Sequence, residues 1–314
     1  MPKPRGVLSE WVVALLAGTD AVPGAAAPGA DSREDEALAL WTLHELSYRG
    51  FEDASDGAEW EPAVLVARHD LESALEERLR ARWTAVDVEP ADVPSALEQV
   101  VADDDGPSLA DHVRRHADRD QVLELLRQRS LYHLKESDPS AWVVPRLPTR
   151  AKAALVELQY DEYGAGNPNR LHAHLFARGL EAVGLRSEYG AYVGDALPET
   201  LEMNNVMSLF GLQRRLRGAA MGHLAAFEMT SSLPSRKLVQ GLGRLGLEGP
   251  MSDYYDEHVE ADAIHEVVAT RDICGTLAED EPDQGPEILF GAFTCLDQEA
   301  RMARALLASW GVEA

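Results

Sequence analysis

Apolar residues recur at steps of three and four through most of this chain of 314 residues, and no stretch shows the sustained two-residue alternation of a half-buried strand. Prolines mark several boundaries of these segments, as at Pro62 and Pro139. A clear segment lies between Glu36 and Gly50, where the apolar positions are Leu38, Trp41, Leu43, Leu46 and Tyr48. The pattern therefore predicts an all-α fold, and the chain is long enough to build a sizeable core.

The order of these segments predicts a single helical domain over residues 36–314. Residues 1–35 are expected to form one short amphipathic helix and a flexible linker rich in alanine, glycine and proline at about 22–32. The helices expected within the domain cover about residues 36–49, 62–83, 95–101, 109–136, 149–163, 172–184, 198–212, 213–231, 252–277 and 286–310. A short segment at 234–247 contains Gly-Leu-Gly-Arg-Leu-Gly, which fits a dinucleotide-binding pattern. Because no strand precedes it, we reject that interpretation.

The net charge of −25 argues against nucleic acids and anionic membrane surfaces as partners, because both attract basic proteins. No apolar run approaches the ~20 residues that a membrane-spanning helix needs. Lys3 and Arg5 precede an apolar stretch as in a signal peptide, but the stretch is short and begins beside Glu10, so we expect a cytoplasmic protein. Cys274 and Cys295 match no disulfide framework or metal-ligand spacing and are expected to be small buried residues.

Three potential metal ligands share one face of the helix expected over residues 252–277. His258, Asp262 and His265 lie at offsets of four and seven residues, which places them within an arc of roughly 60°. Two imidazoles and a carboxylate suit a first-row transition metal better than calcium or magnesium. The alternative is a solvated helix face that carries these residues by chance.

Carboxylates in other segments are candidates for the same site. Glu228 lies within residues 218–229, whose small side chains permit close helix packing, and an unpaired carboxylate buried there would be costly. A metal cation is the simplest partner, and Arg236 is the alternative. Glu162 ends one expected helix and His172 opens the next, so the glycine-rich turn between them is able to bring the two side chains together.

Glu136, at the end of the helix expected over 109–136, is a further candidate. Glu157 lies about 140° around its helix from Glu162 and is expected to face away from the site. The histidines that we expect to be structural or on the surface are His44, His112, His116, His133 and His174.

Taken together, these residues resemble the haem-oxygenase-like diiron oxidases, and most closely the actinobacterial branch described as iron-containing redox enzymes. The matching motifs are Lys135-Glu136-x-Asp138-Pro139, Glu157-x-Gln159-x-Asp161-Glu162-Tyr163-Gly164-x-Gly166, His172, Glu228 and His258-x3-Asp262-x2-His265. Their spacings are also similar to those of the N-oxygenase members of the family. The resemblance covers about residues 36–312.

The resemblance implies a haem-oxygenase-like bundle of about seven core helices with extra N-terminal helices, which carries two iron ions that cycle between Fe2+ and Fe3+. The implied metal ligands, which are also the implied catalytic residues, are Glu136, Glu162, His172, Glu228, His258, Asp262 and His265. Four of them are carboxylates, whose charges would cancel those of two Fe2+ ions in a low-dielectric core. The three imidazoles complete a donor set suited to iron.

The implied reaction uses dioxygen as co-substrate to oxidise a small molecule, by amine N-oxygenation, hydroxylation or C–C cleavage. Because related enzymes act on amino acids and fatty acids, the candidates for binding a substrate carboxylate are Arg146, Arg178 and Arg215. Candidates for contacts to the ligands or to the substrate are Tyr163, Tyr254, Tyr255 and Asn205. An external electron donor and a homodimer are compatible with the resemblance. The alternative is a metal-binding or cofactor-free helical protein of the same fold, without diiron chemistry.

Overall fold

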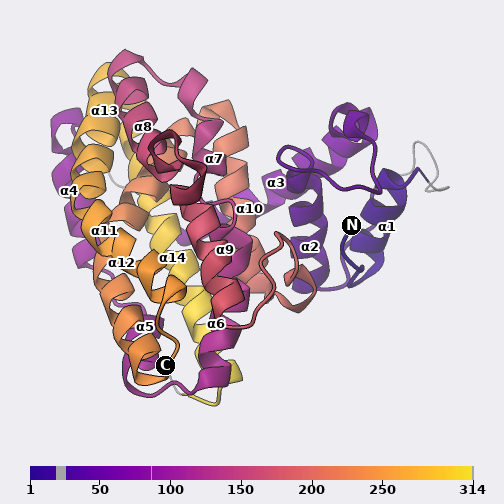
Figure 1. Cartoon of the computed structure of the whole chain (residues 1–314). Helices are drawn as coiled ribbons and strands as arrows, with labels where there is room; N and C mark the ends of the chain where they lie inside the picture. Colours follow the sequence, from indigo (N-terminus) through magenta and orange to yellow (C-terminus); the bar gives the residue numbers. More distant parts are fainter. Residues whose placement is uncertain (19–25, 86, 313–314) are drawn as a thin grey trace.

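The computed structural model describes residues 1–18, 26–85 and 87–312, without the side chains of residues 260–263, and these residues form helices and no strands. The all-α prediction is therefore confirmed. The long helices of the main bundle in Figure 1 include α6 (Arg119–His133), α8 (Thr149–Glu162), α9 (His172–Ala182), α10 (Pro198–Leu212), α11 (Arg217–Arg244), α12 (Pro250–Val267) and α14 (Gly285–Ser309). Within the described residues, no helix combines the length and the apolar character that crossing a membrane requires.

Helices α11 and α14 pack with their backbones in direct contact. A Cβ atom at Gly222 would lie 1.8 Å from the carbonyl oxygen of Ile288, and one at Gly291 would lie 1.9 Å from that of Ala219. Only glycine permits so close an approach of two helices. The apolar core around this contact also contains Cys274 and Cys295, which are buried free thiols as expected. The contact fixes α11, and with it Glu228, against the rest of the bundle.

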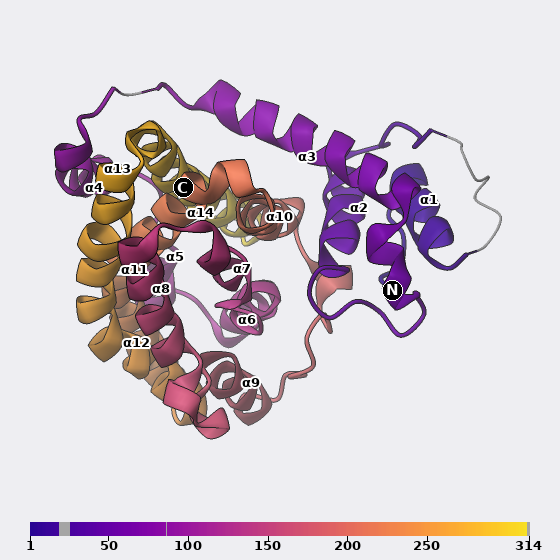
Figure 2. The same ribbon diagram turned by 90° about the horizontal axis from the view of Figure 1, so that it is seen from above.

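Three N-terminal helices form a lobe beside the bundle, as Figure 2 shows: α1 (Val7–Leu16), α2 (Arg33–Glu45) and α3 (Pro62–Arg82). Asp35 on α2 accepts hydrogen bonds from the backbone N–H groups of Leu8 and Ser9, in the first turn of α1 where such groups lack helical partners. Residues 19–25, in and next to the expected linker, lie outside the described residues. In Figure 2, α3 extends from the lobe across the bundle toward α4 (Val93–Ala102).

A buried ion pair joins the lobe to the bundle next to a candidate ligand. Lys135 precedes Glu136, and its Nζ lies 3.4 Å from Oε2 of Glu45 at the end of α2. The hydroxyl of Tyr189 donates to the same oxygen at 2.7 Å, and Lys135 Nζ also lies 4.1 Å from the ring centre of Tyr48. Because Lys135 and Glu45 are both buried, the pair depends on the lobe and the bundle staying in contact.

The prediction of a single helix over residues 109–136 is wrong, because the structure has two helices there, α5 (Leu109–Arg115) and α6. Asp118 caps α6: its side chain accepts a hydrogen bond from the N–H of Gln121, whose side chain accepts one from the N–H of Asp118. Arg244, at the end of α11, donates to three backbone carbonyl groups at the end of α5 and in the turn that follows. These long-range hydrogen bonds stabilise the break.

The ends of α11 and α12 also differ from the prediction. Helix α11 passes through Pro234, where a break was expected, because packing against α12 and α14 outweighs the one backbone hydrogen bond that proline removes. The glycine pattern at 241–246 lies at the end of α11 and just after it, and no strand precedes it among the described residues. Helix α12 is followed by a π-helical segment (Val268–Gly275) and α13 (Thr276–Asp280). Such π turns are frequent at functional sites.

Candidate metal centre

Six of the seven expected ligand residues meet in the interior of the bundle, and all six are buried. They are Glu136 after α6, Glu162 at the end of α8, His172 at the start of α9, Glu228 on α11, and His258 and His265 on α12. Their ligand atoms fall into two groups, in each of which the atoms lie within 4.8 Å of one another: the Glu136 group (Glu136, His172, His258) and the Glu162 group (Glu162, Glu228, His265). The side chain of Asp262 lies outside the described residues, so its role stays a prediction.

In the Glu136 group, a hydrogen bond orients the imidazole of His258. Its Nδ1 lies 2.8 Å from the backbone carbonyl oxygen of Tyr254, one helical turn earlier. Since a carbonyl only accepts, Nδ1 carries a proton, and Nε2 is the ring nitrogen left to bind a metal ion. That Nε2 lies 3.6 Å from Oε1 of Glu136, and the ring of His172 lies 4.7 Å from the ring of His258. This is the usual arrangement of a metal-binding histidine, which donates its second N–H to a fixed acceptor.

In the Glu162 group, two carboxylates face one imidazole. Nδ1 of His265 lies 3.5 Å from Oε1 of Glu162 and 3.7 Å from Oε2 of Glu228. The other oxygen of Glu162 lies 3.0 Å from Nδ1 of His172, which belongs to the Glu136 group, and accepts a hydrogen bond from Ser137. Glu162 therefore stands between the two groups with one oxygen toward each.

The turn after α8 brings Glu162 and His172 together. Gly164 has a φ of +72°, and a Cβ atom there would lie 2.6 Å from the carbonyl carbon of Arg170 and from the nitrogen of Leu171. Ala165 also adopts a left-handed conformation, with φ of 52°. The chain folds back on itself at Gly164 because that residue has no side chain. The start of α9 therefore lies against the end of α8.

Two buried nitrogen atoms have environments that bound cations would explain and that the protein without metal does not. Nδ1 of His172 and Nδ1 of His265 are buried and lie near carboxylate oxygens, yet neither makes a hydrogen bond to a described residue. Buried polar atoms almost always have partners, so atoms without one require an explanation. Lone pairs of imidazoles and carboxylates that converge without hydrogen-bond alignment are what a shared metal ion requires.

The pKa values of the centre also fit bound cations. Burial lowers the pKa of His258, but the carboxylate of Glu136 more than offsets this effect and raises that pKa to about 10. Burial likewise opposes the charged form of His265, while Glu228 and Glu162 raise its pKa to about 9. The carboxylates therefore stabilise positive charge at both groups, and divalent ions would supply it.

His133 is a contributor to the centre that sequence reasoning placed on the surface, and that prediction is wrong. Its side chain is buried, with Nδ1 lying 3.0 Å from Oε1 of Glu136 and 2.7 Å from the hydroxyl of Tyr254. The same hydroxyl donates to both carboxylate oxygens of Glu136 at 3.0 Å. The basic residues near His133 suggested a solvated face, but Arg129 pairs with Glu299 on α14, which makes this face of α6 internal. The three-residue step from His133 to Glu136 was the signal available in the sequence.

Other candidates for contacts to the centre lie further away. Asn205 donates to the backbone of α2 and lies 3.2 Å from His44, whose role is structural as expected. The hydroxyl of Tyr163 donates to Asp138. As expected, Glu157 and His174 are exposed.

The three arginines considered as anchors for a substrate carboxylate are engaged or exposed elsewhere. Arg146 donates to the backbone carbonyl of Gly211, Arg215 pairs with Glu76, and Arg178 is exposed. Among the described residues, none of them lines a cavity at the centre. Arg236, the alternative partner of Glu228, is exposed on α11.

The centre is bounded by an inner hollow and an outer opening. The hollow has a volume of about 20 Å³ and is lined by residues of both groups and by Phe227. The opening has a volume of about 320 Å³ and lies outside His172 and His265. Arg170 and Glu257, which form an exposed ion pair 3.0 Å long, line its rim. The opening therefore adjoins both groups, through His172 and through His265.

Comparisons with known proteins agree with the geometry. Residues 123–300 match the model of a family described as iron-containing redox enzymes. The nitrosourea synthase of Streptomyces achromogenes subsp. streptozoticus is 29% identical over 177 residues, which are 56% of this chain and 38% of that protein. The chain thus spans well under half the length of this curated relative.

Two crystal structures of a CADD-like protein of unknown function from Nostoc punctiforme share the fold. One has a TM-score of 0.55 at 16% identity and covers 70% of this chain and 98% of the Nostoc chain. The other has a TM-score of 0.52 at 17% identity and covers 72% and 99%. These likenesses confirm the expected haem-oxygenase-like helical fold.

Proposed function

The chain belongs to the family of iron-containing redox enzymes, and we propose that it binds two iron ions at its two groups of ligands and oxidises a small molecule with dioxygen. The observation that carries the proposal is the position of Glu162, whose Oε1 faces His265 and whose Oε2 faces His172. A carboxylate so placed is suited to bridge two ions. The proposed ligands are Glu136, Glu162, His172, Glu228, His258, Asp262 and His265.

The charges of this donor set support a pair of divalent ions. With Asp262 the set contains four carboxylates, which balance two Fe2+ ions and leave the buried cluster neutral. Bound iron would supply the electrons and the open coordination positions with which dioxygen reacts. The chain supplies geometry: the hydroxyl of Tyr254 orients Glu136, and the carbonyl of Tyr254 orients His258.

Of the three candidate reactions, amine N-oxygenation, hydroxylation and C–C cleavage, we propose that this protein oxidises an amine nitrogen. The name of the Streptomyces relative states that it makes a nitrosourea, a compound that carries an oxidised nitrogen. Because the chain spans 38% of that relative, the proposal extends only to iron-dependent oxidation of nitrogen and not to nitrosourea synthesis as a whole. Analysis of the reaction products distinguishes oxidation of the nitrogen from hydroxylation and from C–C cleavage.

Metal analysis followed by oxygen uptake tests the proposal. Protein produced with iron and purified without oxygen is expected to contain about two irons per chain. With a chemical reductant present to supply two electrons per turnover, it is expected to consume dioxygen when small amines are added. Glu162→Gln should abolish both properties, because it removes the charge shared by the two groups. Glu157→Gln is the matched control, since Glu157 is exposed on the same helix. One iron or none, without oxygen uptake, would favour the metal-binding or cofactor-free alternative.

A further inference from the structure

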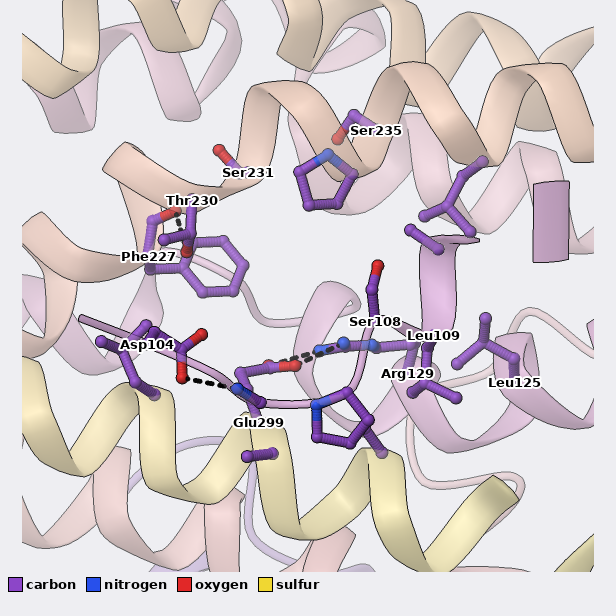
Figure 3. Close-up of a pocket in the computed structure, with 18 of the residues that line it drawn as sticks. Asp104, Ser108, Leu109, Leu125, Arg129, Phe227, Thr230, Ser231, Ser235 and Glu299 are labelled. Carbon is purple, nitrogen blue, oxygen red and sulfur yellow. Dashed lines mark hydrogen bonds and ion pairs between the residues drawn. The ribbon is translucent and has the colours of Figure 1, made fainter. Parts of the chain in front are cut away.

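A cavity of about 220 Å³ lies beside the candidate metal centre, between the start of α5, α6, the middle of α11 and α14 (Figure 3). It is smaller than the ~300–1,000 Å³ typical of pockets for drug-sized ligands, so it suits a small occupant. Its walls are mostly apolar, and the largest apolar side chains include Leu109, Leu125, Phe227, Leu238 and Leu296. An occupant would therefore have an apolar body.

Two of the side chains that line this cavity also adjoin the metal centre. Phe227 lines the cavity and also the inner hollow, which is bounded by Glu136, Glu162 and Glu228. His133 lines the cavity, and its Nδ1 lies 3.0 Å from Glu136. A molecule in the cavity is therefore one side chain away from the proposed metal ligands.

The charged groups of the cavity disfavour anions. Arg129 is the cation among the described residues that line it, and two of its guanidinium nitrogens each lie 2.6 Å from a carboxylate oxygen of Glu299, as Figure 3 shows. This bidentate pair leaves no positive charge for a substrate carboxylate. Asp104 adds a negative charge at the rim. The lining thus carries one more negative than positive charge.

The polar group at the metal-centre end of the cavity is an acceptor. Because the carboxylate of Glu136 only accepts, the hydrogen between it and Nδ1 belongs to His133, which leaves Nε2 as the ring nitrogen that is able to accept a hydrogen bond. Within the described part of the chain, no group donates a hydrogen bond to this Nε2. The N–H of an amine would supply that hydrogen bond.

We propose that this cavity is the substrate site and that the substrate is a small amine with an apolar body, whose nitrogen lies against His133 and Phe227. The inference rests on the proposed function, which it extends to a location and a substrate class. Among the described residues that line the opening outside His265, Ile264 is the one large apolar side chain, and the exposed Arg170–Glu257 ion pair lies at the rim, so this opening is better suited to solvent.

Binding to the iron-loaded protein without oxygen tests the substrate class. The probes are hexylamine, hexan-1-ol and hexanoate, compared by isothermal titration calorimetry. Hexylamine should bind, and hexanoate should bind at least about tenfold more weakly, because its carboxylate would meet Asp104 and Glu299 without a free cation. Hexanoate binding as tightly as hexylamine would overturn the proposal.

Two pairs of variants test the location. Ser235→Phe fills the cavity and should weaken hexylamine binding at least about tenfold with iron content unchanged. Ser232→Phe, on the same helix but outside the cavity lining, should change neither property. If Ser235→Phe does not fold, the exposed Asp104→Asn should weaken hexylamine binding about fivefold without affecting hexan-1-ol, whereas the neighbouring Asp103→Asn should not. Full binding to Ser235→Phe, or to Asp104→Asn, would refute the assignment.

The outcomes separate this inference from the proposed function. If the protein holds two irons and consumes dioxygen but binds no hexylamine, the cavity assignment fails and the function stands. If hexylamine binds in the cavity but the protein holds no iron and consumes no dioxygen, the proposed function fails and the cavity remains an amine site.

Discussion

The two groups of the candidate metal centre contain the same kinds of donor but are held in different ways. In the Glu136 group, the hydroxyl of Tyr254 binds both oxygens of Glu136 and its carbonyl binds His258. In the Glu162 group, Nε2 of His265 faces Asp161 at 3.5 Å, and the Asp161 side chain is 54% exposed. Buried hydrogen bonds thus preorganise Glu136 and His258, while His265 lies beside an exposed carboxylate. We expect the Glu136 group to bind metal more tightly.

Removing one imidazole from each group should give the largest difference. His258→Ala is expected to lower iron affinity more than about 100-fold. It removes one ligand, and it also removes the imidazole that stabilises the buried negative charge of Glu136. His265→Ala should leave about one tightly bound iron per chain. Anaerobic titration of the metal-free variants with Fe2+ measures both effects, with the exposed His174→Ala as control. Equal losses in the two variants would contradict the distinction between the groups.

A substitution in the turn that links the groups should have a smaller effect. Gly164→Ala places a Cβ 2.6 Å from backbone atoms at a φ of +72° and should lower the free energy of unfolding by about 3 kcal/mol. It should also displace His172 from Glu162 and weaken iron binding. Gly166 has a similar φ of +78°, but a Cβ there would meet no atom within 4 Å. Gly166→Ala should therefore lower the free energy of unfolding by only about 1 kcal/mol. Urea unfolding measures both, and equal costs would show that the close approach at Gly164 is unimportant.

The smallest effect concerns a buried histidine that is not in either group. Burial lowers the pKa of His223 to about 4, and Glu299 offsets this only in part, whereas the carboxylates raise the pKa values of His258 and His265. Since the pKa in the unfolded chain is about 6.5, the stability due to neutral His223 is complete above pH 6.5 and is lost as the pH falls toward 4, by roughly 2–3 kcal/mol.

His223→Leu should therefore flatten the dependence of the unfolding free energy on pH between 6.5 and 4. The exposed His116→Leu is the control and should leave that slope unchanged. Denaturant unfolding at several pH values provides the measurement. An unchanged slope in His223→Leu would mean that this histidine is protonated in the folded protein.

Local geometry in the sequence indicated some parts of the centre, and the resemblance to a known family joined them into one expected ligand set. His258 and His265 lie on one face of a helix because they are seven residues apart, and the short turn after Glu162 brings His172 back to it. The carboxylate of Glu228 was recognisable because small residues surround it. Each of these relations involves residues near one another in the chain.

Contacts between distant segments could not be predicted in this way. His133 is internal because Arg129 finds Glu299 on α14, and α5 ends where it does because Arg244 reaches it from α11. The apolar cavity exists only where α5, α6, α11 and α14 meet. In each case, the sequence shows a charged or apolar residue but not the remote partner that determines its environment.

The contact between α2 and the bundle bears on how far this chain can be shortened. A fragment limited to residues 123–300, the part that matches the family model, would keep Lys135 but lose Glu45. It would also uncover Leu131 and Leu201, which are buried against α2 in the intact chain. Water would then reach the residue next to Glu136. We therefore expect the smallest fragment that retains the centre to include α2, although the family match lies entirely outside it.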